Sequence, residues 1–69
     1  MEKDLAEELR TQRRRAYLTQ RQLGEMVGVH RGTVYAWEKG HRRPGLPSMA
    51  KLSAIFPAEA MDRILAATQ

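Results

Sequence analysis

The stretch from Thr19 to Gly40 restricts the fold of this chain more than any other part of the sequence. Thr19 and Gln22 match a capping box, in which each side chain bonds the other residue's backbone amide at the start of a helix. Apolar residues then recur at helical spacing and predict a buried stripe (Leu23, Met26 and Val27). Gly28 suits the left-handed residue that ends a helix. A second helix is expected to begin at about residue 30 and to stop before Gly40.

Helical periodicity also covers the rest of the chain, and no segment shows the β-branched alternation of a strand. A first helix is expected over about residues 3–15, and a fourth from the loop at 41–47 to about residue 56. Pro57 suits the start of a fifth helix because it lacks an amide donor. The apolar side chains expected in the core are Leu5, Leu9, Ala16, Val34, Trp37, Met49, Leu52, Ile55, Phe56, Met61, Ile64 and Leu65. The sequence therefore predicts an all-α fold, a compact bundle of five short helices forming a single domain over residues 1–69.

Basic residues are concentrated in the middle of the chain. The net charge is +4, but residues 10–43 hold nine of the Arg and Lys side chains against only two acids, Glu25 and Glu38. An arginine guanidinium can donate two parallel hydrogen bonds to a phosphate or to the edge of a guanine. Charge alone leaves two interpretations open, a nucleic-acid-binding surface and an ordinary solvated face.

One of these basic residues falls on the inner face of its helix. Arg13 shares a face with Leu5 and Leu9 at helical spacing, where a charge requires a partner. Glu38 lies at the inner edge of the predicted helix over residues 30–39, one turn beyond Val34. We therefore expect an Arg13–Glu38 ion pair that joins the two helices. The alternative is two unconnected surface charges.

Several classes of function have no support in the sequence. The chain has no cysteine, and His30 and His41 lack close carboxylate or histidine partners, so neither a metal ion nor another cofactor is expected. No apolar run approaches the roughly 20 residues of a membrane span, and no signal peptide is visible, which favours a soluble cytoplasmic protein. No nucleophile–base pair, carboxylate pair or phosphate loop suggests an enzyme. A chain of 69 residues leaves no room for a ligand-sensing domain, so no small-molecule ligand is expected.

The stretch LTQRQLGEMVGVHRGTVYAWEKG carries a family resemblance. The matching residues are Leu18, Thr19, Gln20, Leu23, Val27, Gly28, Val29, Val34, Trp37, Glu38 and Gly40. Arg13 and Leu52 fit as well, and Arg13 matches the inward arginine of the family. Over about residues 9–56 the chain resembles the phage-repressor-like (XRE-type, Cro/repressor) regulators, with a helix-turn-helix at about 19–39. The resemblance implies a prokaryotic or phage protein at the nucleoid whose second motif helix enters the major groove of double-stranded DNA.

The resemblance also implies roles for the residues on the outer side of the motif. Those expected to bind phosphates, which position a protein without reading sequence, are Gln20, Arg21, Lys39, Arg42 and Arg43. Those expected to face base edges are Arg31, Thr33, Tyr35 and Ala36, of which Tyr35 reaches either a phosphate or a base, and Gly32 belongs to the same DNA-binding face. Because Gly32 and Ala36 offer no side-chain hydrogen bonds, readout should depend heavily on Arg31, which can donate to both O6 and N7 of a guanine. His30 is either a weak helix cap or a phosphate contact.

Two hypotheses about function follow. The first is a sequence-specific regulator of transcription, a repressor that binds a palindromic operator as a homodimer. The second is an antitoxin-like or adaptor module that binds a protein partner through the two C-terminal helices, after residue 47. Their apolar residues serve either a partner or the core.

Overall fold

Five helices and no strand make up residues 4–67, the part of the chain that the computed structural model describes. The helices are α1 (Leu5–Arg15), α2 (Gln20–Val27), α3 (Arg31–Glu38), α4 (Leu46–Ser53) and α5 (Ala58–Ala67). The predicted all-α bundle of five short helices is therefore confirmed. The single domain was predicted over residues 1–69 and the first helix from about residue 3. Residues 1–3 and 68–69 lie outside the described residues.

Local hydrogen bonds set the start and the end of α2. The Thr19 hydroxyl accepts from the amide of Gln22 at 3.0 Å, and the Gln22 side chain accepts from the amide of Thr19 at 2.8 Å. The predicted capping box is thus present. Gly28 follows the helix with φ at 86°, a left-handed conformation that a glycine adopts without steric cost.

The turn between α2 and α3 is tight because Gly24 has no side chain. A Cβ atom at Gly24 would lie 2.6 Å from the carbonyl oxygen of Val29, closer than atoms can approach without a shift of the backbone. The amides of Gly28 and Val29 both donate to the Gly24 carbonyl at 2.8 Å. This contact holds the start of α3 against the last turn of α2.

The end of α1 is built differently. The amide of Tyr17 donates to the backbone carbonyl of Arg14 at 3.0 Å, and the amide of Leu18 donates to the backbone carbonyl of Arg13 at 3.2 Å. This is the Schellman arrangement of a helix end. Tyr17 takes the left-handed position with φ at 60°, and its side chain is 93% exposed. A tyrosine pays a steric penalty at a position where glycine is usual.

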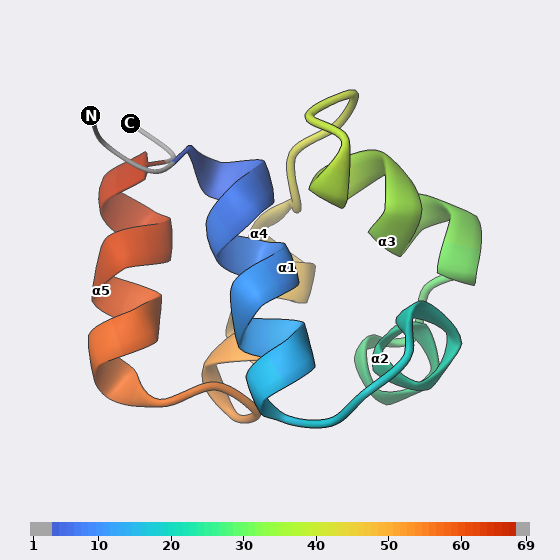
Figure 1. Ribbon diagram of the computed structural model, residues 1–69, viewed down its shortest axis with the longest axis horizontal. Helices are drawn as coiled ribbons and strands as arrows, with labels where there is room; N and C mark the ends of the chain where they lie inside the picture. Colours follow the sequence, from blue (N-terminus) through green and yellow to red (C-terminus); the bar gives the residue numbers. More distant parts are fainter. Residues whose placement is uncertain (1–3, 68–69) are drawn as a thin grey trace.

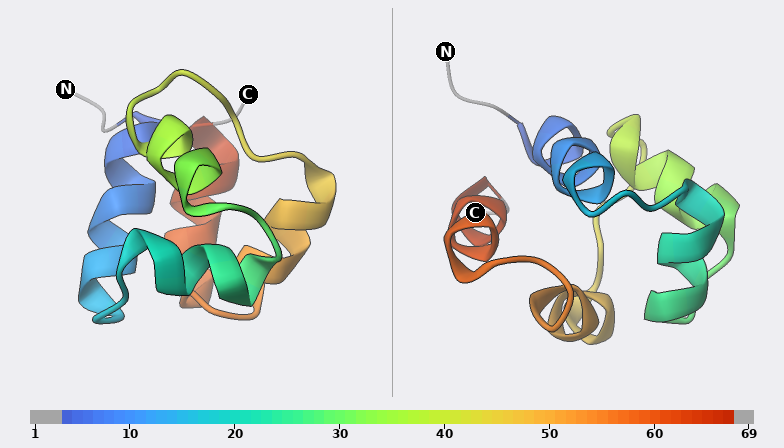
Figure 2. Two further views of the ribbon diagram at one scale, coloured as in Figure 1. Left: turned by 90° about the vertical axis from the view of Figure 1, so that its right-hand side faces the viewer. Right: turned by 60° about the horizontal axis from the view of Figure 1, so that its bottom comes forward.

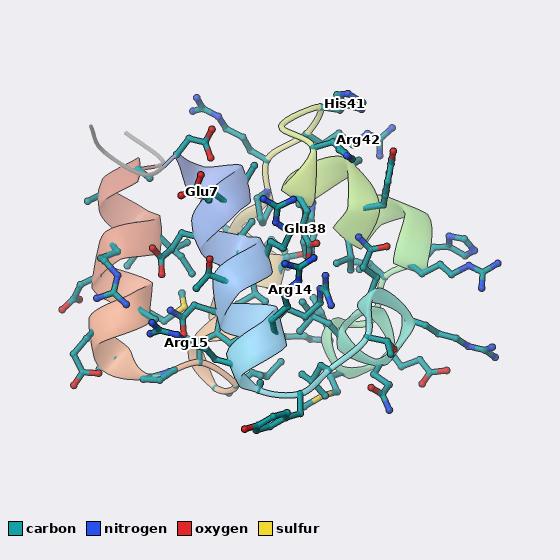
Figure 3. The ribbon with its side chains drawn as sticks, in the orientation of Figure 1. Glu7, Arg14, Arg15, Glu38, His41 and Arg42 are labelled. Atoms are coloured by element: carbon teal, nitrogen blue, oxygen red, sulfur yellow. The ribbon has the colours of Figure 1, made fainter. Side chains whose placement is uncertain are left out.

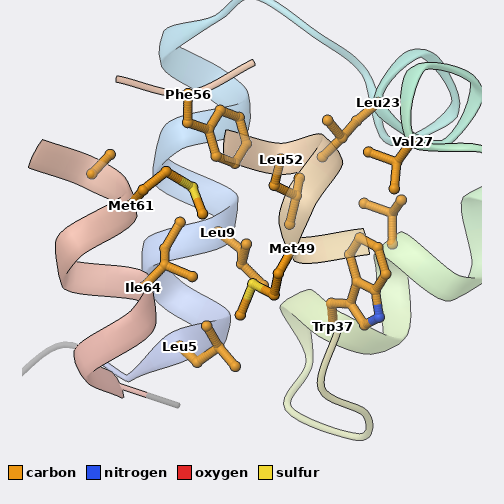
Figure 4. Close-up of a cluster of buried hydrophobic side chains, with 12 residues drawn as sticks. Leu5, Leu9, Leu23, Val27, Trp37, Met49, Leu52, Phe56, Met61 and Ile64 are labelled. Carbon is orange, nitrogen blue, oxygen red and sulfur yellow. The ribbon is translucent and has the colours of Figure 1, made fainter. Parts of the chain in front are cut away.

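One core joins all five helices (Figure 4). Its buried apolar residues are Leu5, Leu9, Leu23, Val27, Val34, Trp37, Met49, Leu52, Phe56, Ala60, Met61 and Ile64. Most of the expected core is thus confirmed. In the ribbon views α1 lies beside α5 on one side, while α2 and α3 pack together on the other (Figures 1 and 2).

Four of the expected core positions are wrong or only partly right. Ala16 is exposed because it is the C-cap of α1 and lies beyond its last turn. Met26 is 52% exposed and Leu65 is 48% exposed, since each lies about 100° around its helix from a buried neighbour, Val27 or Ile64. Ile55 is half-buried.

The fourth helix is also shorter than predicted. It ends at Ser53, and the following residues form a turn in which the amides of Ile55 and Phe56 both donate to the Leu52 carbonyl at 2.9 Å. Phe56 still enters the core, at 5% exposure.

Candidate nucleic-acid interface

The ion pair between α1 and α3 is present and largely buried. Arg13 Nε donates to Glu38 Oε2 at 2.6 Å and Nη2 donates to Oε1 at 2.9 Å, a two-point contact between a planar guanidinium and a carboxylate. The side chains are 11% and 3% exposed. The hydrogen bond to Glu38 raises the pKa of Arg13 above its usual value, against the opposing effect of burial. The two hydrogen bonds of this pair fix α3 relative to α1.

Two further contacts extend this pair toward the start of α2. Arg13 Nη1 donates to the backbone carbonyl of Leu18 at 2.8 Å, and Gln20 Nε2 donates to Glu38 Oε1 at 3.2 Å. Gln20 had been expected to bind a phosphate. One of the two amide N–H donors of its side chain is occupied by Glu38, so only the other is available for an external acceptor.

The outer side of α3 presents the residues expected to face the bases. Its inner side chains are buried (Val34, Trp37 and Glu38). Arg31 and Gly32 are exposed at the first turn, and Tyr35 is 48% exposed one turn later. Thr33 and Ala36 are half-buried at the edges of this face. The structure therefore brings together on one helix side all five residues that the sequence placed there.

His30 is the N-cap of α3. Its Nδ1 atom accepts a hydrogen bond from the backbone amide of Gly32 at 2.9 Å. Of the two roles that the sequence left open for His30, the helix cap is thus present. The phosphate contact stays a prediction.

An open hollow of about 380 Å³ lies where α2 meets the start of α3. It is lined by Arg21, Glu25, Val29, His30 and Arg31. Arg21 Nε lies 3.6 Å from Glu25 Oε2, and these side chains are 71% and 68% exposed, so water and salt screen their attraction. The lining of the hollow therefore combines three basic or hydrogen-bonding side chains with one acid and the apolar side chain of Val29.

The remaining basic residues lie at the other end of α3 and on the loop that follows it. Lys39 Nζ lies 5.6 Å from the centre of the Tyr35 ring, a cation–π distance that holds both side chains on the outer face. Arg42 and Arg43 are exposed, and Figure 3 shows His41 and Arg42 projecting from this loop. The amides of His41 and Arg42 donate to the Ala36 carbonyl at 2.9 and 3.3 Å, which ties the loop to the helix end.

A sequence family described as Helix-turn-helix matches residues 9–60. The chain belongs to this helix-turn-helix family. The resemblance to phage-repressor-like regulators is thus confirmed. A search of curated proteins finds no match.

Among solved structures, the helix-turn-helix domain is similar to the c2 repressor of phage P22 in complex with the synthetic operator 9T in the presence of Tl⁺. The TM-score is 0.71 and the sequence identity 27%, over 87% of this chain and 83% of that chain. Identity at this level, together with the family match, assigns the five-helix arrangement to a repressor fold.

Three polar contacts of this helix-turn-helix domain were not predicted from the sequence, two made by Glu8 and one between Gln20 and Glu38. Glu8 is 2% exposed, accepts from Gln12 Nε2 at 2.8 Å and pairs with Arg63 Nε at 3.3 Å, which links α1 to α5. The position of Glu8, next to Leu9 and three residues after Leu5, was the available signal. The link from Gln20 to Glu38 had no such signal because it depends on how α2 crosses α3.

Within residues 4–67, no three His, Cys, Asp or Glu side chains come together as a metal ion would require. No described helix has the length and apolar character to span a bilayer.

Proposed function

We propose that this protein is a sequence-specific double-stranded-DNA-binding regulator of transcription. It acts as a repressor, as a homodimer on a palindromic operator, in the cytoplasm of a prokaryotic cell or on phage DNA. Its α3 enters the major groove by its N-terminal end, while the start of α2 lies against the phosphate backbone.

The observation that carries this proposal is the outward face of α3. The first turn of α3 exposes an arginine and a glycine that make no contribution to the core. The buried ion pair on the opposite side of α3 fixes the orientation of this helix. Arg31 is long enough to reach a base edge, whereas Gly32 and Ala36 allow the helix backbone to come close to the groove. Arg21, Lys39, Arg42 and Arg43 flank this face and supply positive charge for phosphates.

The comparisons support the same assignment. The chain matches a helix-turn-helix family over most of its length, and the structurally similar P22 c2 repressor is bound to an operator in its solved structure. A repressor role is inferred for this chain from that similarity.

Pairing of two chains is inferred from size. A single module of this kind buries a modest area on DNA, about 600–1,000 Å² of protein surface, and gains affinity by binding two half-sites about one helical turn apart. A palindromic operator follows from the two-fold symmetry of such a pair.

Selection of bound duplexes from a random pool, with the intact chain, tests the proposal. A consensus with two inverted half-sites spaced about 10 base pairs apart supports a dimeric regulator. A consensus with a single unrepeated site would support DNA binding but contradict binding as a homodimer. No sequence enrichment would contradict sequence-specific binding and favour the protein-interaction alternative.

The alternative hypothesis, a protein-interaction module that uses α4 and α5, has less support. The apolar residues that such a module would offer to a partner are Ile55, Phe56, Met61, Ile64 and Leu65. Three of these five are buried in the core (Phe56, Met61 and Ile64). Ile55 is half-buried and Leu65 is 48% exposed. The core therefore uses most of the surface that this alternative needs.

A further inference from the structure

His30 has one ring nitrogen engaged by the protein. Gly32 donates its backbone N–H to Nδ1 at 2.9 Å, so Nδ1 carries a lone pair and no proton. In a neutral imidazole the other nitrogen must then carry the proton. The cap thus selects the tautomer in which Nε2 is a hydrogen-bond donor, and it turns this donor away from the helix backbone.

Gly32 is the residue that admits this arrangement. A Cβ atom there would lie 3.1 Å from His30 Nδ1 and 3.6 Å from Cε1. The first of these distances is tight, so an alanine at this position would require the imidazole to shift by a few tenths of an ångström. Glycine is otherwise a poor residue inside a helix, by about 1 kcal/mol relative to alanine. The glycine leaves room for the imidazole at its hydrogen-bonded position.

The ring lines the hollow between α2 and α3, beside Arg21, Glu25, Val29 and Arg31. No residue among positions 4–67 accepts a hydrogen bond from His30 Nε2. The Nε2–H of His30 is therefore a donor whose ring is oriented by the hydrogen bond at Nδ1 and which has no acceptor within the described residues. Arg31, by contrast, has a flexible side chain that loses more entropy when it is ordered.

We propose that His30 is a second DNA-reading residue beside Arg31, and that its Nε2–H donates to an acceptor atom of the operator. The proposal rests on the DNA-binding function proposed above. The acceptor is N7 of a purine in the major groove, because a phosphate contact would not read sequence. Such a contact excludes cytosine at that point, since the major-groove edge of cytosine presents an N4 donor.

The first test needs no DNA. Nitrogen NMR of the imidazole in the free protein distinguishes the two neutral tautomers, and we expect protonated Nε2 and unprotonated Nδ1. In the Gly32→Ala variant we expect the two tautomers to mix. A wild-type ring that is protonated on Nδ1 overturns the proposal, whether or not the protein binds DNA. This measurement therefore separates the proposal from the proposed function.

The second test uses His30→Ser, which keeps a good N-cap and removes the Nε2 donor. Serine should leave the urea midpoint unchanged or slightly higher, while affinity for the selected operator falls about 3- to 10-fold, the value of one hydrogen bond. His30→Ala loses the cap as well and serves as the matched control for helix stability. If His30→Ser binds the operator as tightly as the wild type, His30 is a cap only and the proposal is wrong.

The source of the acceptor is found by modifying the operator. Purines are replaced one at a time by their 7-deaza forms, and phosphates one at a time by methylphosphonates. The wild type should lose about 3- to 10-fold at one modified position that leaves His30→Ser unaffected. A 7-deaza position supports the contact from His30 to N7 of a purine. A methylphosphonate position makes His30 a phosphate contact and overturns the proposal that it reads a base. Equal sensitivity of both proteins at every position contradicts a direct contact from His30.

Discussion

Replacing Arg13 by Met and Glu38 by Leu, singly and together, measures how strongly the buried ion pair holds α1 against α3. The Glu38 carboxylate is 3% exposed, and the Arg13→Met change removes both hydrogen bonds that the guanidinium donates to it. The Gln20 amide still donates to this carboxylate at 3.2 Å. Loss of one partner from a buried pair costs about 3–5 kcal/mol because the other charge is left without compensation. Glu38→Leu should cost less, since Arg13 keeps the Leu18 carbonyl at 2.8 Å and is 11% exposed.

These losses are large relative to the whole domain. At typical values per residue, a chain of this length has a free energy of unfolding of roughly 3–10 kcal/mol. Each single variant should therefore lose much of its stability. The double variant should recover much of the loss, because two apolar side chains of similar size need no desolvation of charge. We expect a coupling free energy of about 2–3 kcal/mol between the two sites.

Urea unfolding, followed by circular dichroism, measures the free energy of unfolding of all four proteins. An equal slope of this free energy with urea concentration in all four checks that unfolding stays two-state. The exposed pair formed by Arg21 and Glu25, 3.6 Å apart, supplies a matched control. The same substitutions there should couple by less than about 0.5 kcal/mol. A single variant that is unfolded in buffer while the double variant folds leads to the same conclusion. Additive losses at Arg13 and Glu38, no larger in coupling than the control, would refute the reasoning.

Three further predictions concern the interface and the end of α1. The logarithm of the DNA-binding constant should fall with the logarithm of the salt concentration by about 0.9 per phosphate, for about 4–6 phosphates per subunit, and titrations at several salt concentrations check this. Replacing Arg42 and Arg43 by Ala should weaken binding to all duplexes alike, and a selective loss at one sequence speaks against phosphate contacts. Arg31→Ala should cost about 1–3 kcal/mol on the selected operator and relax preference at one base pair per half-site, measured against a singly altered operator and unrelated DNA; equal losses on all three make Arg31 a phosphate contact. Tyr17→Gly should raise stability by about 1 kcal/mol, since it removes a left-handed tyrosine whose side chain is 93% exposed; an unchanged urea midpoint contradicts the assigned strain.

The contacts that the sequence determined are mostly local. The capping box at Thr19 and Gln22 and the left-handed Gly28 depend on residues three or four positions apart, so the pattern of the chain is enough to predict them. The apolar spacing of Leu23 and Val27 places them in the core for the same reason. The Arg13–Glu38 pair is long-range, yet it was predictable because a charge on an apolar face requires a partner and a suitable acid was at hand.

Only the tertiary structure decided the contacts that depend on how the helices cross. The apolar spacing could not separate Val27, which is buried, from Met26, which is half exposed, because the width of the buried face depends on the neighbouring helix. The double use of Glu38 by Arg13 and Gln20 depends on the angle between α2 and α3. The imidazole of His30 could have capped α3 or faced outward. Its orientation follows from the hydrogen bond that the Gly32 amide donates to Nδ1, and this bond exists only where the backbone has formed the first turn of α3.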